Sequence, residues 1–270
     1  MTANQTFQLE ETRGWRMGLK NLMRKESVEW WKTRRWWIQL LLWSIVINSL
    51  ILLVIFAFPH AANLAGQEIP DSEIFLMAIQ VLFFVASLGF GLGVVIISQD
   101  EIISEKTNGT AAWVLSKPAT RVAFYLSKLF VNGFSVLILM ITIPMAIAFI
   151  VLSLSYPELN VMAFLVAVGI LVIHTFFYLC LSLMVGVFSE KRSLVLSLTL
   201  GALLGGQVLM NFVKEIVVFT PFGLSQIMIG IIVEGLNTIP VILWIPVGAT
   251  FLFSVIFIFL SVWKIQKLEF

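Results

Sequence analysis

Residues 161–188 read VMAFLVAVGILVIHTFFYLCLSLMVGVF, a stretch without a single Asp, Glu, Lys or Arg. About twenty consecutive apolar residues are enough for a helix to cross the hydrocarbon core of a bilayer. The apolar residues run continuously rather than in alternation, which argues against a strand of a membrane barrel. The stretch therefore predicts a transmembrane helix, and its length leaves room for tilting or for extension beyond the bilayer.

The rest of the chain has the same character. Of its 270 residues 60% are hydrophobic and 12% are charged, with a mean hydropathy of +1.01, whereas soluble domains carry about 25% charged residues. We therefore predict an all-α, polytopic membrane protein with six spans. The predicted spans are Trp36–Phe58, Ile74–Ser98, Val122–Leu152, Val161–Phe188, Ser193–Phe212 and Pro240–Trp263. Pro144 is expected to kink the third of them.

Basic residues alternate between the segments that join these spans. Sixteen of the seventeen Lys and Arg residues fall in every second segment, and only Lys214 lies on the other side. Because Lys and Arg are enriched in cytoplasmic loops, both termini are predicted to be cytoplasmic. The first apolar run begins only after some 35 polar residues, so we expect no cleaved signal peptide. The expected location is the cell membrane.

Residues 1–35 are predicted to form a cytoplasmic amphipathic segment before the first span. Arg13, Arg16, Lys20 and Arg24 share one helical stripe, which is typical of a helix lying in the membrane interface. Tryptophans favour the headgroup zone and cations favour anionic lipid. The further expected anchor residues are Trp30, Trp31, Arg34, Arg35, Trp36 and Trp37. This segment either positions the first span alone or acts as an elbow that also contacts a cytoplasmic partner.

Residues 99–121 form the largest internal cytoplasmic loop, and residues 100–121 read DEIISEKTNGTAAWVLSKPATR. Glu101 and Glu105 share one face of a polar extension of the second span, where they repel unless a basic group approaches. Gly109 favours a left-handed helix end, and Thr110 and Thr120 are placed to begin new helices. The pattern predicts a short, partly apolar helix held across the surface. It is either a plain connector or a docking element.

The loop resembles that of ABC-2 type permeases of ABC transporters. The resemblance is carried by Glu105, Gly109-Thr110, Leu115-Ser116, Pro118 and Arg121, followed by Lys128, at matching spacing. It extends to the six-span plan, the basic N-terminus and the chain length. The sequence departs from many members at Thr107 and Asn108, where they carry carboxylates.

This resemblance implies a coupling helix that docks in a cleft of a separate cytoplasmic ATPase, with ATP and Mg²⁺ on that partner. The implied contact residues are Glu101, Glu105, Gly109, Thr110, Trp113, Leu115, Ser116, Pro118 and Arg121. It also implies a second permease copy, identical or related, a prokaryotic source, and a re-entrant outer segment at residues 220–236. Trp113 and Leu115 are the expected apolar anchors, since aromatic anchors often carry interface energy.

Other motifs were weighed against this interpretation. The sequence has no G-x-x-x-x-G-K-[ST] element, so ATP hydrolysis is not expected on this chain, and no catalytic signature indicates an enzyme. Gly89, Gly91 and Gly93 lie inside an apolar run without a preceding strand, which favours helix packing over dinucleotide binding. Gly201, Gly205 and Gly206 likewise favour packing or a dimer contact. A net charge of +2 gives no reason to expect nucleic-acid binding.

Few polar residues lie within the spans. His174 is either a pathway residue or a neutral imidazole bonded to a neighbouring helix, and the second reading is favoured. Asn48, Gln80, Gln207 and Asn211 either line a pathway or join helices by hydrogen bonds. No second histidine or carboxylate accompanies His174, so no metal site is predicted.

The sequence therefore predicts the permease subunit of an ATP-driven exporter of hydrophobic or amphipathic cargo. The alternative is a related membrane module that transmits ATPase motion to an extracytoplasmic partner, or that protects the cell without exporting a small molecule.

Overall fold

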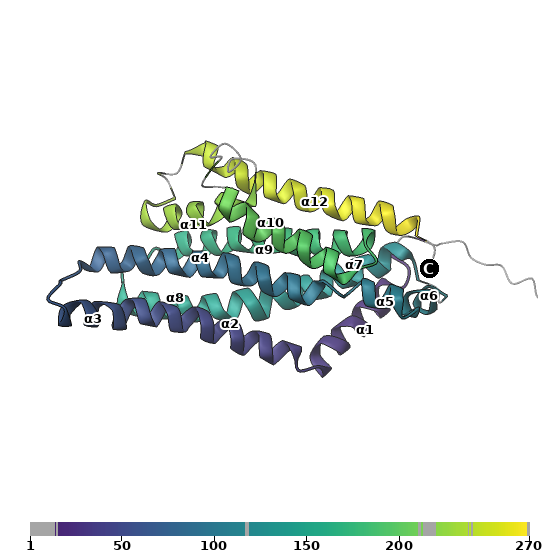
Figure 1. Cartoon of the computed structure of the whole chain (residues 1–270), viewed down its shortest axis with the longest axis horizontal. Helices are drawn as coiled ribbons and strands as arrows, with labels where there is room; N and C mark the ends of the chain where they lie inside the picture. Colours follow the sequence, from purple (N-terminus) through teal and green to yellow (C-terminus); the bar gives the residue numbers. More distant parts are fainter. Residues whose placement is uncertain are drawn as a thin grey trace, which may run out of the picture.

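The computed structural model describes residues 14, 16–116, 119–209, 212, 220–236, 238 and 240–268. These residues form helices and turns without a strand, and the long helices run side by side along the molecule (Figure 1). In chain order the α-helices are α1 Leu19–Lys32, α2 Arg35–Leu52, α3 Phe58–Leu64, α4 Asp71–Ser98, α5 Ile103–Thr107, α6 Thr110–Leu115, α7 Arg121–Ser135, α8 Ile143–Ser155, α9 Val161–Phe188, α10 Arg192–Leu209, α11 Leu224–Val233 and α12 Ile245–Gln266. The described chain also contains two π-helical turns, η1 Leu53–Ala57 and η2 Val136–Thr142. It contains two 3₁₀ turns as well, η4 Pro221–Gly223 and η5 Val241–Trp244.

Five helical stretches of the described chain are long and apolar enough to cross a membrane. They are Arg35–Leu64, Asp71–Thr107, Arg121–Ser155, Val161–Phe188 and Ile245–Gln266. Each overlaps a predicted span, and the fourth agrees with its prediction at both ends. The last begins at Ile245 instead of Pro240, because η5 precedes it and Pro246 stands in its first turn, where a missing N–H costs nothing.

The remaining predicted span, Ser193–Phe212, corresponds to α10. The part of α10 whose residues are fully described, Arg192–Gly206, is apolar but shorter than the five stretches that could cross a membrane. Asn211 lies outside the described residues. The count of six spans therefore stays a prediction.

The third span is irregular near Pro144, as the sequence predicted. A π-helical turn, η2, comes directly before α8, and Pro144 stands at the start of α8. Proline lacks an N–H and its ring crowds the carbonyl four residues earlier. A wider π turn accommodates both effects.

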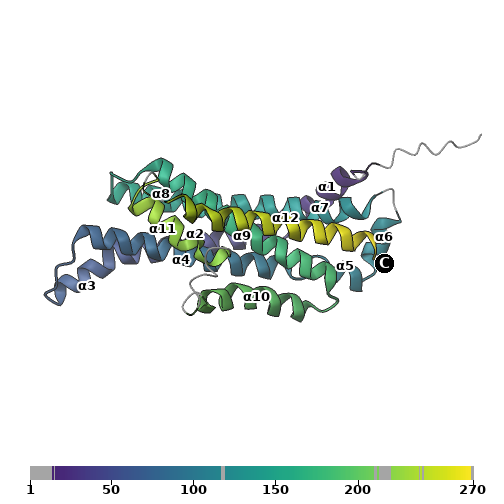
Figure 2. The same ribbon diagram turned by 90° about the horizontal axis from the view of Figure 1, so that it is seen from above.

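The short helices gather at the two ends of the bundle. Helices α1, α5 and α6 and the last turn of α12 lie at one end, whereas α3 and α11 lie at the other (Figures 1 and 2). Helix α11 has ten residues, and its buried side chains pack against α9 and α4. It is too short to span a bilayer, and it occupies the position of the predicted re-entrant segment. Which end faces the cytoplasm stays a prediction.

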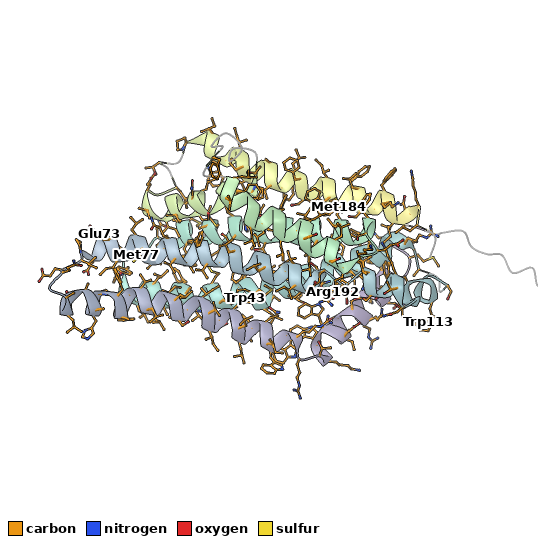
Figure 3. The ribbon with its side chains drawn as sticks, viewed as in Figure 1. Trp43, Glu73, Met77, Trp113, Met184 and Arg192 are labelled. Carbon is orange, nitrogen blue, oxygen red and sulfur yellow. The ribbon has the colours of Figure 1, made fainter. Side chains whose placement is uncertain are left out.

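Glycines on α4 allow its neighbours to approach closely. A Cβ atom added at Gly89 or Gly93 would collide with the Trp43 indole of α2, and one at Gly91 would lie 2.8 Å from Leu203 of α10. Trp43 also meets the edge of Phe90 at a centroid distance of 5.6 Å. Figure 3 shows Trp43 where α2 passes α4. The prediction that these glycines serve helix packing is confirmed.

Candidate functional site

The loop after α4 folds as helix, turn, helix, turn, helix. The predicted continuous extension through Asn108 is interrupted by a turn at residues 99–102, and the helix resumes as α5. Gly109 has φ +69°, a conformation that glycine adopts without strain, and α6 follows it directly. The Thr120 hydroxyl accepts a hydrogen bond from the Ala123 N–H at 3.1 Å, so the predicted cap of the third span is confirmed.

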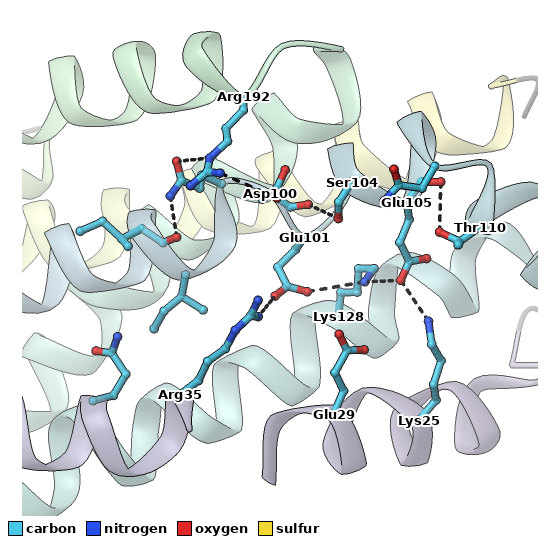
Figure 4. Close-up of a pocket in the computed structure, with 15 residues that line it drawn as sticks. Lys25, Glu29, Arg35, Asp100, Glu101, Ser104, Glu105, Thr110, Lys128 and Arg192 are labelled. Carbon is cyan, nitrogen blue, oxygen red and sulfur yellow. Dashed lines mark hydrogen bonds and ion pairs between the residues drawn. The ribbon is translucent and has the colours of Figure 1, made fainter. Parts of the chain in front are cut away.

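A buried lysine lies at the centre of this end of the molecule. The side chain of Lys128, on α7, is 2% exposed. Its Nζ atom lies 3.2 Å from Glu26 Oε2, 3.5 Å from Glu101 Oε2 and 2.9 Å from Glu105 Oε1. Glu26 belongs to α1, and the other two glutamates belong to the loop. One ammonium group therefore joins the first helix, the loop and the third span. Figure 4 shows Lys128 between Glu101 and Glu105 of the loop.

Two further cations complete this cluster from its outer side. Lys25 Nζ lies 3.0 Å from Glu105 Oε1, and Arg35 Nη1 lies 3.3 Å from Glu101 Oε1. Partial burial works against the charged form of Lys25, yet Glu105 and Glu26 raise its pKa above the ordinary value. Buried charges are tolerated only when they are paired, so each member of the cluster depends on the others. We call Lys25, Glu26, Arg35, Glu101, Glu105 and Lys128 the charge cluster.

Other contacts tie the same loop to the remaining helices. The Lys106 ammonium donates to the carbonyls of Gly186, Val187 and Ser189 at 3.0, 2.6 and 3.1 Å. A cation here satisfies carbonyls that the end of α9 leaves unpaired. Arg121 donates to the Gln266 carbonyl of α12 at 2.6 Å, and Arg192 of α10 donates to Gln99 at 3.0 Å. The loop and its flanking residues thus contact α1, α2, α7, α9, α10 and α12.

Replacing Lys106 by methionine is expected to loosen the loop without unfolding the spans. The change keeps most of the side-chain volume but leaves three carbonyls without their donor, at a cost of about 1–3 kcal/mol. Limited proteolysis in detergent should then cut within residues 99–120 faster than in the parent protein. Lys191→Met, at an exposed position nearby, is the matched control and should leave the cleavage rate unchanged. Equal rates for both variants would contradict the prediction.

The predicted partner-contact residues fall into two groups. Glu101 and Glu105 point inward, their side chains are 12% exposed, and their basic neighbours come from this chain. The basic groups that the sequence led us to expect on a partner are therefore supplied internally. Trp113 is 62% exposed and lies at the outer end of the molecule (Figure 3). The exposed Ser116 donates to the Trp113 carbonyl at 2.7 Å.

The other predicted contacts are distributed around α6. The Thr110 hydroxyl donates to the Glu105 carbonyl at 3.3 Å and closes the turn at Gly109. Arg121 is engaged with the end of α12. Leu115 ends α6, and Pro118 lies outside the described residues. Helix α6 with Trp113 is thus the part of the loop that faces outward.

The anchor segment differs from its prediction in two respects. Gly18, with φ +80°, precedes the first residue of α1, so Arg16 lies in a turn before the helix rather than on the predicted stripe. Trp30 is buried and donates to Asn132 Oδ1 of α7 at 2.8 Å, because α1 packs against α7 instead of lying on lipid alone. Arg13 is outside the described residues. The exposed anchor residues are Lys20, Arg24, Trp31, Arg34, Arg35 and Trp37, and Trp36 is partly buried.

The predicted pathway residues whose side chains the structure describes, Asn48, Gln80 and His174, do not meet at one place. The Asn48 amide donates to the Ser44 and Pro144 carbonyls at 2.8 and 3.3 Å, joining α2 to α8. His174 is buried, and its ring nitrogens lie 3.3 Å from the carbonyls of Ser87 and Pro221. Gln80 is exposed on α4. Gln207 lies on α10, and Asn211 is outside the described residues. Asn48 and His174 therefore serve as interhelical hydrogen-bonding groups.

Lys128 is the central residue of the cluster, and the sequence pointed to it only as the last residue of the resemblance in the loop. It was counted among the loop cations, although it lies inside the predicted span Val122–Leu152. A lone cation within an apolar run is a functional candidate by default, and that signal was available. Lys25, Glu26 and Lys106 carried no comparable signal, because each stands among other charged residues.

A polar cavity of about 510 Å³ opens beside the charge cluster. Its charged lining residues are Lys25, Glu29, Arg35, Asp100, Glu101, Glu105, Lys128 and Arg192, and Figure 4 shows them converging from α1, α2, α7, α10 and the loop. The cavity is therefore bounded by the elements that the charge cluster joins.

Comparison with known proteins agrees with this architecture. Residues 27–208 match the family model described as ABC-2 family transporter protein. The match covers about two thirds of the chain and includes α2, the loop and most of the bundle. No curated protein matches the chain.

Proposed function

Because the chain belongs to the ABC-2 family of transporter membrane proteins, and is therefore a permease subunit of an ABC-type transporter, we propose that it serves an exporter driven by a separate cytoplasmic ATPase. The ATPase carries ATP and Mg²⁺. It docks on α6, and two permease copies, identical or related, form the pathway. The membrane is the cell membrane of a prokaryote, with both termini in the cytoplasm.

The observation that carries this proposal is the arrangement of the loop 99–121. Its inward side is held by ion pairs and hydrogen bonds to six helices, whereas Trp113 on α6 is 62% exposed at the outer end. Packed elements with such contacts move as units instead of deforming continuously. A displacement of α6 by a docked partner is therefore transmitted to α7 through Lys128 and to α9 through Lys106.

The cargo class follows from the surfaces of the spans. Large apolar side chains are exposed along α2, η1, α10 and α12, including Ile45, Phe56, Leu198 and Phe259. Asn48 and His174 are occupied by interhelical hydrogen bonds. A hydrophobic or amphipathic cargo that moves along apolar helix surfaces suits these features better than an ion does.

Trp113→Ala is expected to lower the affinity for the ATPase by about thirtyfold, because an exposed aromatic side chain on a docking helix is a typical interface hot spot. The measurement is co-purification of a P-loop ATPase with the tagged full-length chain in detergent. Trp37→Ala, at an exposed tryptophan on α2, should retain the ATPase. Folded wild-type protein that holds no P-loop ATPase would contradict the proposed function.

A further inference from the structure

The polar cavity beside the charge cluster carries an unbalanced negative charge. Its lining holds four cations and four carboxylates. Glu26, which contacts Lys25 and Lys128 from α1, adds a fifth carboxylate to the same network. The local charge is therefore about −1, and a concave site with such a balance attracts a cationic group.

The lining carboxylate that lacks a cation among the described residues is the one on Glu29. Lys25, Arg35, Lys128 and Arg192 all lie within 4.0 Å of a carboxylate oxygen. The Glu29 side chain has no ion pair or hydrogen bond within the part of the chain that the structure describes. It faces the cavity from α1 (Figure 4) and is close enough to Glu101 to repel it.

Glu105 has an acceptor atom without a partner beside the same cavity. Its Oε1 atom accepts from both Lys25 and Lys128, whereas its Oε2 atom is buried without a hydrogen-bond partner. An unsatisfied buried acceptor is costly, about 1–3 kcal/mol. Because this oxygen is closed off from the cavity, a donor reaches it only when the Glu105 side chain turns.

We propose that the cavity receives a basic side chain of the ATPase, which pairs with Glu29. This inference rests on the proposed function and adds a second contact to the one made by α6. Arginine suits the site best, because its guanidinium presents five donors in a fixed fork. A phosphate or other anion does not suit it, since every lining cation is already beside a carboxylate.

Glu29→Gln tests the proposal because it removes the charge and nearly keeps the shape. Because the Glu29 side chain has no partner among the described residues, the variant should melt at the wild-type temperature, yet bind the ATPase about tenfold more weakly. Glu29→Lys should bind more weakly still. Glu190→Gln, at another exposed carboxylate of the same end, is the matched control and should bind as wild type does.

A photoreactive benzoylphenylalanine at position 29 locates the contact directly. In the complex of the tagged full-length chain with its P-loop ATPase, the crosslinked peptide should contain Arg or Lys. Wild-type affinity of Glu29→Gln, with crosslinking at position 113 and none at position 29, would overturn this inference and leave the proposed function standing. Absence of any P-loop ATPase from the wild-type preparation would overturn both.

Discussion

Lys128→Met is expected to destabilise the protein more than any other change of a charged residue. The substitution removes the cation that Glu26, Glu101 and Glu105 share and leaves them only the outer cations Lys25 and Arg35. The three carboxylate side chains are only 6–12% exposed. Removing one partner of a buried ion pair costs about 3–5 kcal/mol, which is a large part of the total stability of about 5–15 kcal/mol of a folded domain. We expect little folded protein after extraction in mild detergent.

The measurement is the thermal midpoint in detergent, read from the monodisperse peak in size-exclusion chromatography. At roughly 2–4 °C per kcal/mol for a chain of this size, the midpoint should fall by about 10 °C. Lys20→Met, at an exposed position of α1, should leave it unchanged. Adding Glu26→Gln to Lys128→Met should restore part of the loss by removing one stranded charge. A midpoint within about 1 °C of wild type for Lys128→Met would show that the cluster does not hold this end together.

Gly89→Leu is expected to have the second largest effect, for a different reason. Even a Cβ atom at this position would collide with the ring of Trp43. The indole is rigid and already packs against the ring of Phe90, so it cannot easily make room. Overpacking of this kind costs about 1–3 kcal/mol, and forcing α2 away from α4 adds the loss of their contacts. The thermal midpoint should fall by about 5 °C or more.

Gly169→Leu is the matched control for this prediction. Gly169 lies on α9, and a Cβ atom added there meets nothing within 4 Å. Leucine favours a helix more than glycine does, so this variant should melt at or above the wild-type temperature. The double change Gly89→Leu with Trp43→Ala should recover part of the loss, because the volume removed lies where the new side chain enters. Equal midpoints for the two leucine variants would show that the approach of α2 to α4 is not limited by Trp43.

Features that depend only on neighbouring residues could be predicted from the sequence. The apolar runs predicted the long helices, because the length of apolar chain needed to cross a bilayer is a local property. The turn at Gly109 and the cap at Thr120 were likewise predicted, since each depends on one side chain and the backbone beside it. The repulsion between Glu101 and Glu105 correctly indicated that a basic group must approach them.

The identity of these basic groups depends on how the helices pack. Lys128 contacts Glu26 across 102 positions of sequence, and Lys25 contacts Glu105 across 80. Trp30, expected at the lipid interface, instead reaches Asn132 on α7. Such pairings follow from how helices pack, and packing depends on the shapes of whole helix faces such as the glycine-lined side of α4. The sequence specifies which residues lie on each helix face. Which two faces pack against each other depends on the fold of the whole chain.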